Sequence, residues 1–484
     1  MKRGIMMDEK RSQHFLDLAR SHFDRIIETG RALTGPKPTQ MWWSSLDVRT
    51  GHYPADDARP PDIPKRAYRH IDAPNGCTMY WDQPHLVAAH AVSARCDDPK
   101  YAEAANAYTA DFLRICVAKN GLFLWGNHYY YHVIYGGVVR FIEDITLCDM
   151  AAEDGSLHEI RPISPAWELF WQADPQRTEA EIRAAARNHV YDLNTGAFNR
   201  HADRTRGLCF VESGGFLVEA LCWLAAKTGD ESCVDLALRI ARYSYEGRHE
   251  ATGLLRNQRS RDRWDQHCST TEVGLWALSL LQAASCSQVD ELRQMARNAV
   301  AAYLEHGYDP DTRRYWGKLN VATGEPIPGK PDTIYQPDTH ADIWEPLFPT
   351  HDYPLAMASA CVELAAAAEQ ADEPAEPFDS AICRWADIVR EETPPPDAKG
   401  GYAEHYGRAI HFLTTAGRQR GCPEYIELAQ SVADDAVDTL FTHGMFRTHP
   451  GEWRYDAVDG VGFLILALLE LESDQPIDLQ GFHF

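Results

Sequence analysis

The sequence predicts an all-α protein in which six or seven helical hairpins close into an α/α toroid, with long loops rimming one mouth and minor β-structure. Three observations lead to this prediction. A unit of two Ala- and Leu-rich helices recurs, its apolar residues follow the i, i+3, i+4, i+7 spacing, and the loops between units vary widely in length. The alternative is an open solenoid of the tetratricopeptide kind, which is also built from helical hairpins. Such a solenoid would have nearly constant spacing and short loops, unlike this chain.

The hairpins follow one another along the chain. Clear units span residues 86–126, 217–257, 277–317 and 411–446, and a weaker one spans 355–390. Their internal turns carry Gly, Asp or Pro, where a helix has to stop and restart. Short strands are expected near residues 313–318 and 446–454, where aromatic residues flank turn residues. We expect one domain over residues 1–484, with an N-terminal helix and a long rim loop in 1–80 and the hairpin repeats in 81–475.

Composition excludes several classes of function. A formal net charge of −24, from 71 acidic and 47 basic residues, disfavours partners such as nucleic acids and anionic membranes. No apolar run approaches the ~20 residues of a membrane helix, and the N-terminus lacks the apolar stretch of a secretory signal, so a cytoplasmic location is expected. The 12 cysteines include no CxxC pair, which indicates reduced thiols. The oligomeric state is not predicted.

The sharpest polar motif runs from Asn127 to His132, after an aromatic loop and before a helix expected from about residue 133. Six consecutive polar or phenolic side chains are hard to bury without partners. Such a set suits β-elimination from a uronate, in which an amide neutralises the carboxyl group and His or Tyr transfers protons. The alternative is that the tyrosines, including the predicted substrate contact Tyr131, only pack at a helix start.

Asn127-His128 followed by tyrosines resembles the Asn-His signature of α/α-toroid polysaccharide lyases, including alginate lyases. This chain has Gly126 and Tyr131 where the alginate-lyase signature has Asn and Trp. The resemblance implies a toroid and a lyase that acts on uronate glycans. It also implies a set of catalytic roles: Asn127 as carboxyl neutraliser, His128 and Tyr406 as base and acid, and Arg408 as carboxylate support.

A second cluster opens a helix near residue 402. Glu404, Arg408 and His411 stand at i, i+4 and i+7, so one helical face presents an acid, a base and an imidazole. We expect His405 and His411 to contact substrate from this helix. A surface ion pair between Glu404 and Arg408 is the alternative interpretation.

A Trp-Asp-Gln triplet occurs twice at the start of a predicted helix, at residues 81–83 and 264–266. Tryptophan stacks on sugar faces, while Asp, Gln and His hydrogen-bond hydroxyl groups. An N-cap role for each Asp is the alternative. The predicted substrate-binding residues from these regions are Trp81, Asp82, Trp264, Asp265 and His267, and Glu212 is a further predicted substrate contact.

A fourth segment, residues 335–345 with 351–353, is dense in His and Asp, and such density is one source of divalent-metal sites. The segment has no HExxH, CxxC or regular His spacing, so we expect no metal and no other cofactor, with a divalent metal as the alternative. No nucleotide-binding glycine motif occurs. Further candidate carboxylate-binding arginines are Arg59, Arg66, Arg69, Arg447 and Arg454.

The leading hypothesis is therefore a lyase that cleaves a uronate-containing oligo- or polysaccharide by β-elimination. The alternative is a glycoside hydrolase on the same toroid, with two carboxylates drawn from Asp82, Glu212, Asp265 and Glu272. A sugar 2-epimerase with a histidine pair and a non-catalytic helical scaffold are two further possibilities.

Overall fold

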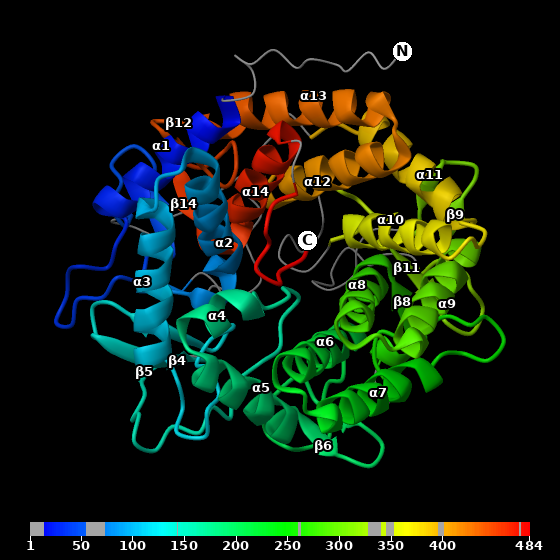
Figure 1. Ribbon diagram of the computed structural model, residues 1–484, viewed down its shortest axis with the longest axis horizontal. Coiled ribbons are helices and arrows are strands. Elements are labelled where there is room, and N and C mark those ends of the chain that lie inside the picture. The colour runs from blue at the N-terminus through cyan, green and yellow to red at the C-terminus, as the bar shows by residue number, and fades with distance from the viewer. Residues whose placement is uncertain are drawn as a thin grey trace.

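The computed structural model describes residues 14–54, 73–142, 144–259, 263–327, 340–344, 353–394, 401–473 and 476–484. Their helices form two concentric layers around one axis (Figure 1). The inner layer contains α2 (Met79–Cys96), α4 (Trp167–Ala173), α6 (Val211–Thr228), α8 (Thr270–Ser287), α10 (Leu355–Gln370), α12 (Ala403–Arg420) and α14 (Val461–Glu472). The outer layer contains α1 (His14–Thr29), α3 (Lys100–Ile115), α5 (Pro175–His189), α7 (Glu231–Glu246), α9 (Asp290–Gly307), α11 (Phe378–Glu391) and α13 (Pro423–Leu440).

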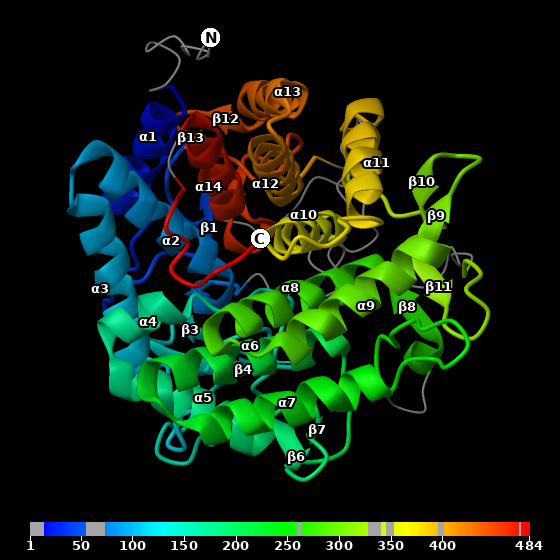
Figure 2. The same cartoon turned by 45° about the vertical axis from the view of Figure 1, so that its right-hand side comes forward.

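This arrangement confirms the predicted α/α toroid. The five hairpins expected from the sequence are present, and two more complete the ring: α4 with α5, and α14 with α1. The α4–α5 hairpin escaped the periodicity argument because α4 has only 7 residues and the buried face of α5 contains Ile182 and three alanines among four polar residues. The turned view in Figure 2 shows α1 lying against α14, so the first and last described helices close the ring.

The two layers differ in how their helices are buried. The inner helix α14, VGFLILALLELE, is buried on nearly every side, whereas the outer helix α7 buries one stripe that includes Val234, Ala237 and Ile240. An amphipathic helix faces a core on one side only, and a helix that is apolar all round needs neighbours on every side. The sequence pattern therefore separates the inner layer from the outer layer.

Glycines allow neighbouring inner helices to meet at close range. A Cβ atom added at Gly274 of α8 would lie 2.5 Å from the backbone nitrogen of Met357 in α10. One added at Gly462 of α14 would lie 2.3 Å from the backbone nitrogen of His85 in α2. Each glycine stands in the first turns of its helix, so the helix starts, and the polar residues on them, are held close together.

Short antiparallel strands connect the hairpins. One sheet has the order β2 (Gly76–Cys77), β3 (Tyr129–His132), β4 (Gly137–Phe141) and β5 (Ile145–Leu147). The strand pairs are β1 (Ser45–Asp47) with β14 (Arg454–Asp456), β6 (Val190–Asp192) with β7 (Ala197–Phe198), β8 (His267–Ser269) with β11 (Lys318–Asn320), β9 (Tyr308–Asp309) with β10 (Arg314–Tyr315), and β12 (Phe441–Thr442) with β13 (Met445–Phe446). The strands expected near 313–318 and 446–454 are thus present.

The prediction of a helix from about residue 133 is wrong. Residues 129–141 instead form the hairpin of β3 and β4, in which Tyr130 is opposite Val139. Aromatic and β-branched side chains favour strands, and Gly136, with φ of 64°, supplies the left-handed residue of the turn. The Asn127-His128 motif therefore precedes a strand.

The cysteines and the apolar character of the helices bear on two expectations from composition. All twelve cysteines lie in the described part of the chain and none forms a disulfide. Among the helices of the described ranges, none combines the length and apolar character that a membrane crossing requires.

Candidate functional site

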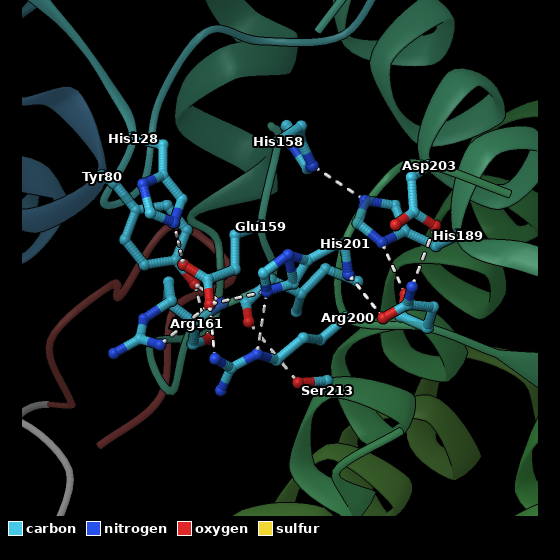
Figure 3. A network of polar contacts seen from close by, with 12 residues as sticks. Tyr80, His128, His158, Glu159, Arg161, His189, Arg200, His201, Asp203 and Ser213 are labelled. Atoms are coloured by element: carbon cyan, nitrogen blue, oxygen red, sulfur yellow. Dashed lines mark hydrogen bonds and ion pairs between the residues drawn. The ribbon is translucent and has the colours of Figure 1, made fainter. Parts of the chain in front are cut away.

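A buried ionic cluster is centred on Glu159, which lies in the loop before α4 and is 1% exposed. Its Oε1 lies 3.1 Å from Arg161 Nη1, 3.1 Å from Arg200 Nη2 and 3.3 Å from His201 Nε2. Its Oε2 lies 3.7 Å from His128 Nε2. Figure 3 shows the four cationic or imidazole side chains converging on this single carboxylate.

Backbone pairing brings the two halves of the cluster together. Glu159 and His201 form an antiparallel bridge, and the Ile160 amide donates to the Arg200 carbonyl at 3.0 Å. The Ala202 amide donates to the carbonyl of the residue before Glu159, also at 3.0 Å. The segment after β7 is thereby fixed beside the segment before α4, although some 40 residues separate them along the chain.

The cluster has an excess of positive charge. Burial alone would raise the pKa of Glu159, but the charges of Arg161 and Arg200 hold it well below its usual range. Guanidinium groups keep their charge at any pH that a folded protein meets, so two permanent cations face one anion. Burial also lowers the pKa of the His201 imidazole. The site therefore attracts one further anionic group.

Asn127 and His128 are part of this cluster, as the sequence motif suggested. Asn127 is 3% exposed, and with its amide oxygen facing Arg161 it accepts hydrogen bonds from Nε at 3.0 Å and Nη2 at 3.2 Å. His128 Nδ1 lies 3.1 Å from the carbonyl oxygen of Phe141. Since a carbonyl can only accept, Nδ1 carries the hydrogen, and Nε2, which faces Glu159, is the basic nitrogen of the neutral ring.

A second layer of histidines supports the turn that carries Arg200 and His201. His158 Nδ1 lies 2.8 Å from His189 Nε2, and His189 Nδ1 donates to the Asn199 carbonyl at 2.8 Å. The Asn199 side chain in turn accepts from the His201 amide at 3.1 Å and donates to Asp203 at 3.0 Å. This chain of hydrogen bonds, also drawn in Figure 3, fixes the backbone at Arg200 and His201.

Two carboxylates from adjacent inner helices lie beside the cluster. Glu212 stands in the first turn of α6 and Glu272 in the first turn of α8. The pKa of Glu212 is raised to about 8 by burial and by the charge of Glu272, against the opposing influence of Arg200 and Arg161. Glu272 accepts a hydrogen bond from Ser269 Oγ. Arg200 lies over the ring of the residue that precedes α6, which places Glu212 at the edge of the cluster.

The other predicted catalytic residues lie on α12. The Tyr406 hydroxyl donates to Asp435 Oδ2 of the outer helix α13 at 2.6 Å, so it faces the outer layer. Arg408 is buried, pairs with Glu404 Oε1 at 2.8 and 3.0 Å, and packs between the rings of Tyr353 and Phe463. The expected i,i+4 pair is therefore present, but it is buried and not on the surface.

Several residues predicted to contact substrate are buried and contact other parts of the protein instead. Trp81 is 1% exposed, and Asp82 accepts hydrogen bonds from Tyr108 at 2.7 Å and Tyr455 at 3.1 Å. Burial raises the pKa of Asp82 to about 7. The Tyr131 hydroxyl donates to the carbonyl oxygen of residue 37 at 2.6 Å. These contacts match the packing alternative better than a sugar-binding role.

The remaining predicted contacts are dispersed. His267 begins β8 and is buried, His405 is buried in α12, and Asp265 is partly exposed. His411 pairs with Glu470 Oε2 at 2.6 Å. The Trp264 side chain lies outside the described residues.

The segment considered for a metal is described only in part. His340 pairs with Asp309 Oδ2 at 3.0 Å and stacks on Trp316, while residues 335–339, 345, 351 and 352 lie outside the described ranges. Arg59, Arg66 and Arg69 lie outside them too. Within the described ranges, no group of three or more His, Cys, Asp or Glu side chains is arranged to hold a metal ion.

Sequence reasoning missed Glu159, Arg161, Arg200 and His201. A usable signal was present in the run Asn199-Arg200-His201-Ala202-Asp203-Arg204, which is as polar as the Asn127 motif and also precedes an inner helix. What the sequence could not supply was the pairing of this run with the loop at Glu159.

Comparison with known proteins gives weak but related similarities. A family model described as periplasmic pectate lyase matches residues 82–206, about a quarter of the chain, and this segment contains the whole Glu159 cluster. A pectate disaccharide-lyase of Dickeya dadantii is 24% identical over 269 residues, which are 50% of this chain and 45% of that protein. The chain thus spans less than half the length of this curated relative.

Solved structures of similar shape have lower identity. A family 76 glycoside hydrolase (mannosidase) of Bacteroides thetaiotaomicron is 12% identical, with 95% of this chain and 97% of that chain covered and a TM-score of 0.49. A cellobiose 2-epimerase of Bacillus thermoamylovorans is 10% identical, with 96% and 99% covered and a TM-score of 0.47.

Proposed function

We propose that the chain is a carbohydrate-active lyase that cleaves uronate-containing oligo- or polysaccharides by β-elimination. One observation carries the proposal: two permanently charged guanidinium groups, with Asn127 and a basic imidazole nitrogen beside them, share a single buried carboxylate. This charge excess suits the carboxylate of a uronate. The similarity to pectate lyases supports the same class and makes polygalacturonate the first substrate to try.

The residues of the cluster divide into two roles. Arg200, whose side chain is 23% exposed, receives the substrate carboxylate, with Arg161 and Asn127 behind it. Neutralising that carboxylate makes the C5 proton more acidic, because the charge that develops in the transition state falls on the carboxyl group. His128 Nε2, on a side chain that is 19% exposed, then removes the C5 proton.

Residues on α12 are not central to this proposal. The hydroxyl of Tyr406 already donates to Asp435, so it lacks the geometry for the acid role. Arg408 has an Nη1 without a hydrogen-bond partner among the described residues, and it remains the predicted support for a substrate carboxylate on that side.

The test is a product assay. Wild-type protein is incubated with polygalacturonate, alginate and glucuronan while the ultraviolet absorbance of an unsaturated, conjugated uronate is followed. Absorbance should rise with at least one polymer, and it should be lost in Arg200→Gln. Absence of any rise with all three polymers would overturn the proposal.

A glycoside hydrolase is the second candidate, favoured by the adjacent carboxylates Glu212 and Glu272. Of the four acids considered from the sequence, Asp82 is enclosed by two tyrosines, whereas Glu212 lies within electrostatic reach of Arg200, Arg161 and Glu272. Hydrolysis releases new reducing ends without new ultraviolet absorbance. Measuring both quantities on the same sample distinguishes the two reactions.

A metal requirement is measured in the same assay. The proposed steps use the chain's own side chains, and the assay is run with EDTA and with added Mn²⁺, Mg²⁺ and Ca²⁺. Dependence of the rate on an added ion, abolished in both His128→Ala and His201→Ala, would assign these imidazoles and Glu159 to a metal, since such ions take these donor types. The cytoplasmic location stays a prediction, and the matching family is described as periplasmic.

A further inference from the structure

We propose that Glu212 is the proton donor to the leaving glycosidic oxygen. This inference rests on the proposed lyase function and adds the acid that the Glu159 cluster lacks. Glu212 is 8% exposed, and its Oε2 is buried without a hydrogen-bond partner among the described residues. A buried polar atom without a partner is costly unless a ligand completes it, so the atom points to a substrate group.

The first turn of α6 is fastened to the arginine cluster by two contacts. The Arg200 guanidinium lies 5.1 Å from the centre of the Phe210 ring, immediately before α6. Ser213 Oγ donates to the Ile160 carbonyl at 3.5 Å, and Ile160 lies between Glu159 and Arg161. The helix start that carries Glu212 therefore lies next to Arg200, the proposed ligand of the substrate carboxylate.

The surroundings of Glu212 keep a proton on it. Burial and the charge of Glu272 raise its pKa to about 8, so near neutral pH most molecules carry the acid form. Glu272 itself is held as a hydrogen-bond acceptor by Ser269 Oγ, which accepts from Asn257 Nδ2 at 2.9 Å. A substrate carboxylate bound to Arg200 would offset the positive charge that opposes protonation of Glu212.

The tyrosines of the neighbouring motif already donate their hydroxyl protons elsewhere. Tyr129 donates to Glu153 Oε1 at 2.8 Å, Tyr130 to the Pro74 carbonyl at 3.1 Å, and Tyr131 to a backbone carbonyl at 2.6 Å. Each phenol would have to break its hydrogen bond before it could serve as acid. Within the described part of the chain, Oε2 of Glu212 has no such competing partner.

The proposed elimination needs a base at C5 and an acid at the leaving oxygen. His128 takes the C5 proton, and the electrons of the C5–H bond form the C4–C5 double bond. The electrons of the C4–O bond pass to the leaving oxygen, which takes the proton from Glu212 and departs as a free hydroxyl group. Water then returns a proton to Glu212, and His128 releases its proton to water.

The experiment compares substrates whose leaving groups differ in their need for a proton. Glu212→Gln should reduce kcat on the polysaccharide by about 10²–10⁴-fold, the usual contribution of a general acid. On a uronide whose C4 substituent is fluoride or dinitrophenolate, which leaves without a proton, the same variant should stay within about threefold of wild type. The alkaline limb of the wild-type kcat profile should be absent in the variant.

Glu219→Gln is the matched control. Glu219 lies two turns further along α6, is also buried and pairs with His483 Nε2 at 3.0 Å. This control should keep wild-type activity on both substrates. If Glu212→Gln does not fold, Glu212→Asp keeps a carboxylic acid one methylene shorter, and its loss should again be confined to the polysaccharide.

The outcomes separate the two proposals. Wild-type protein that yields no unsaturated product refutes the lyase function, whatever the variants do. Wild-type lyase activity with a Glu212→Gln variant that is unimpaired, or equally impaired on both substrates, refutes the role of Glu212 alone.

Discussion

Replacing Glu159 with Gln should destabilise the folded protein, because Glu159 is the carboxylate that pairs with both Arg161 and Arg200 in the buried cluster. Removing one partner of a buried ion pair costs about 3–5 kcal/mol, since the remaining charge stays buried. Arg161 is 4% exposed and takes nearly the full penalty, while the partly exposed Arg200 takes less. We therefore expect a decrease of about 3–5 kcal/mol in the free energy of unfolding at pH 7.

The pH dependence of this loss gives a sharper measurement. The folded pKa of Glu159 lies below the unfolded value near 4.5, so its stabilisation is present above that value and is lost as the pH falls toward the folded pKa. Urea unfolding of wild type and Glu159→Gln is followed by tryptophan fluorescence at several pH values. The two midpoints should approach each other as the pH is lowered below about 4.5. Equal midpoints at pH 7, or a gap that widens in acid, would refute the assignment of Glu159 as the hub of the charges.

Three further predictions concern the site, a buried acid and the helix packing. His128→Ala should reduce kcat on the cleaved polymer by about 10²-fold or more without changing the unfolding midpoint greatly, and steady-state kinetics would contradict this if kcat were preserved. Asp82 has a folded pKa of about 7 against 3.8 in the unfolded chain, so wild-type stability should fall relative to Asp82→Asn as the pH rises from 4 to 7, and parallel urea midpoints would argue against it. Gly462→Ala should lower Tm, because its Cβ would lie 2.3 Å from the His85 nitrogen, whereas Gly317→Ala, with its nearest neighbour at 3.4 Å, should change Tm little.

The hairpins could be predicted because helical periodicity is a local property of the chain. The outer helix α7 carries its buried stripe in its own sequence, and the Gly or Asp residues at its ends mark its bounds. By contrast, α4 is too short to show a period, and the Tyr129–His132 strand looked like a helix start because four consecutive buried residues contain no alternation. Those residues are buried on both faces, which removes the pattern that distinguishes a strand.

Only some residues of the candidate site could be predicted from the sequence. Asn127 and His128 stood out as a dense polar run, and they do lie in the ionic cluster. Glu159 and Arg200 did not stand out, because their meeting depends on backbone pairing between two loops that are distant in sequence. Tyr406 stood out by composition, yet the side of α12 on which its hydroxyl lies depends on where α13 packs.

The pairing of α1 with α14 has a consequence for how the chain reaches this fold. The carboxylate of Glu472 accepts hydrogen bonds from the backbone amides of Phe15 and Leu16 at 3.0 and 3.2 Å, across a sequence separation of up to 457 residues. Contacts of such separation form late and slowly, because a long loop must close before they contribute. During synthesis the apolar face of α1, which includes Phe23 and Ile26, therefore waits without its partner until α14 has been made. A circularly permuted chain that opens at the turn between α6 and α7 would be made with α14 and α1 in quick succession, and it should fold with less aggregation than the present order.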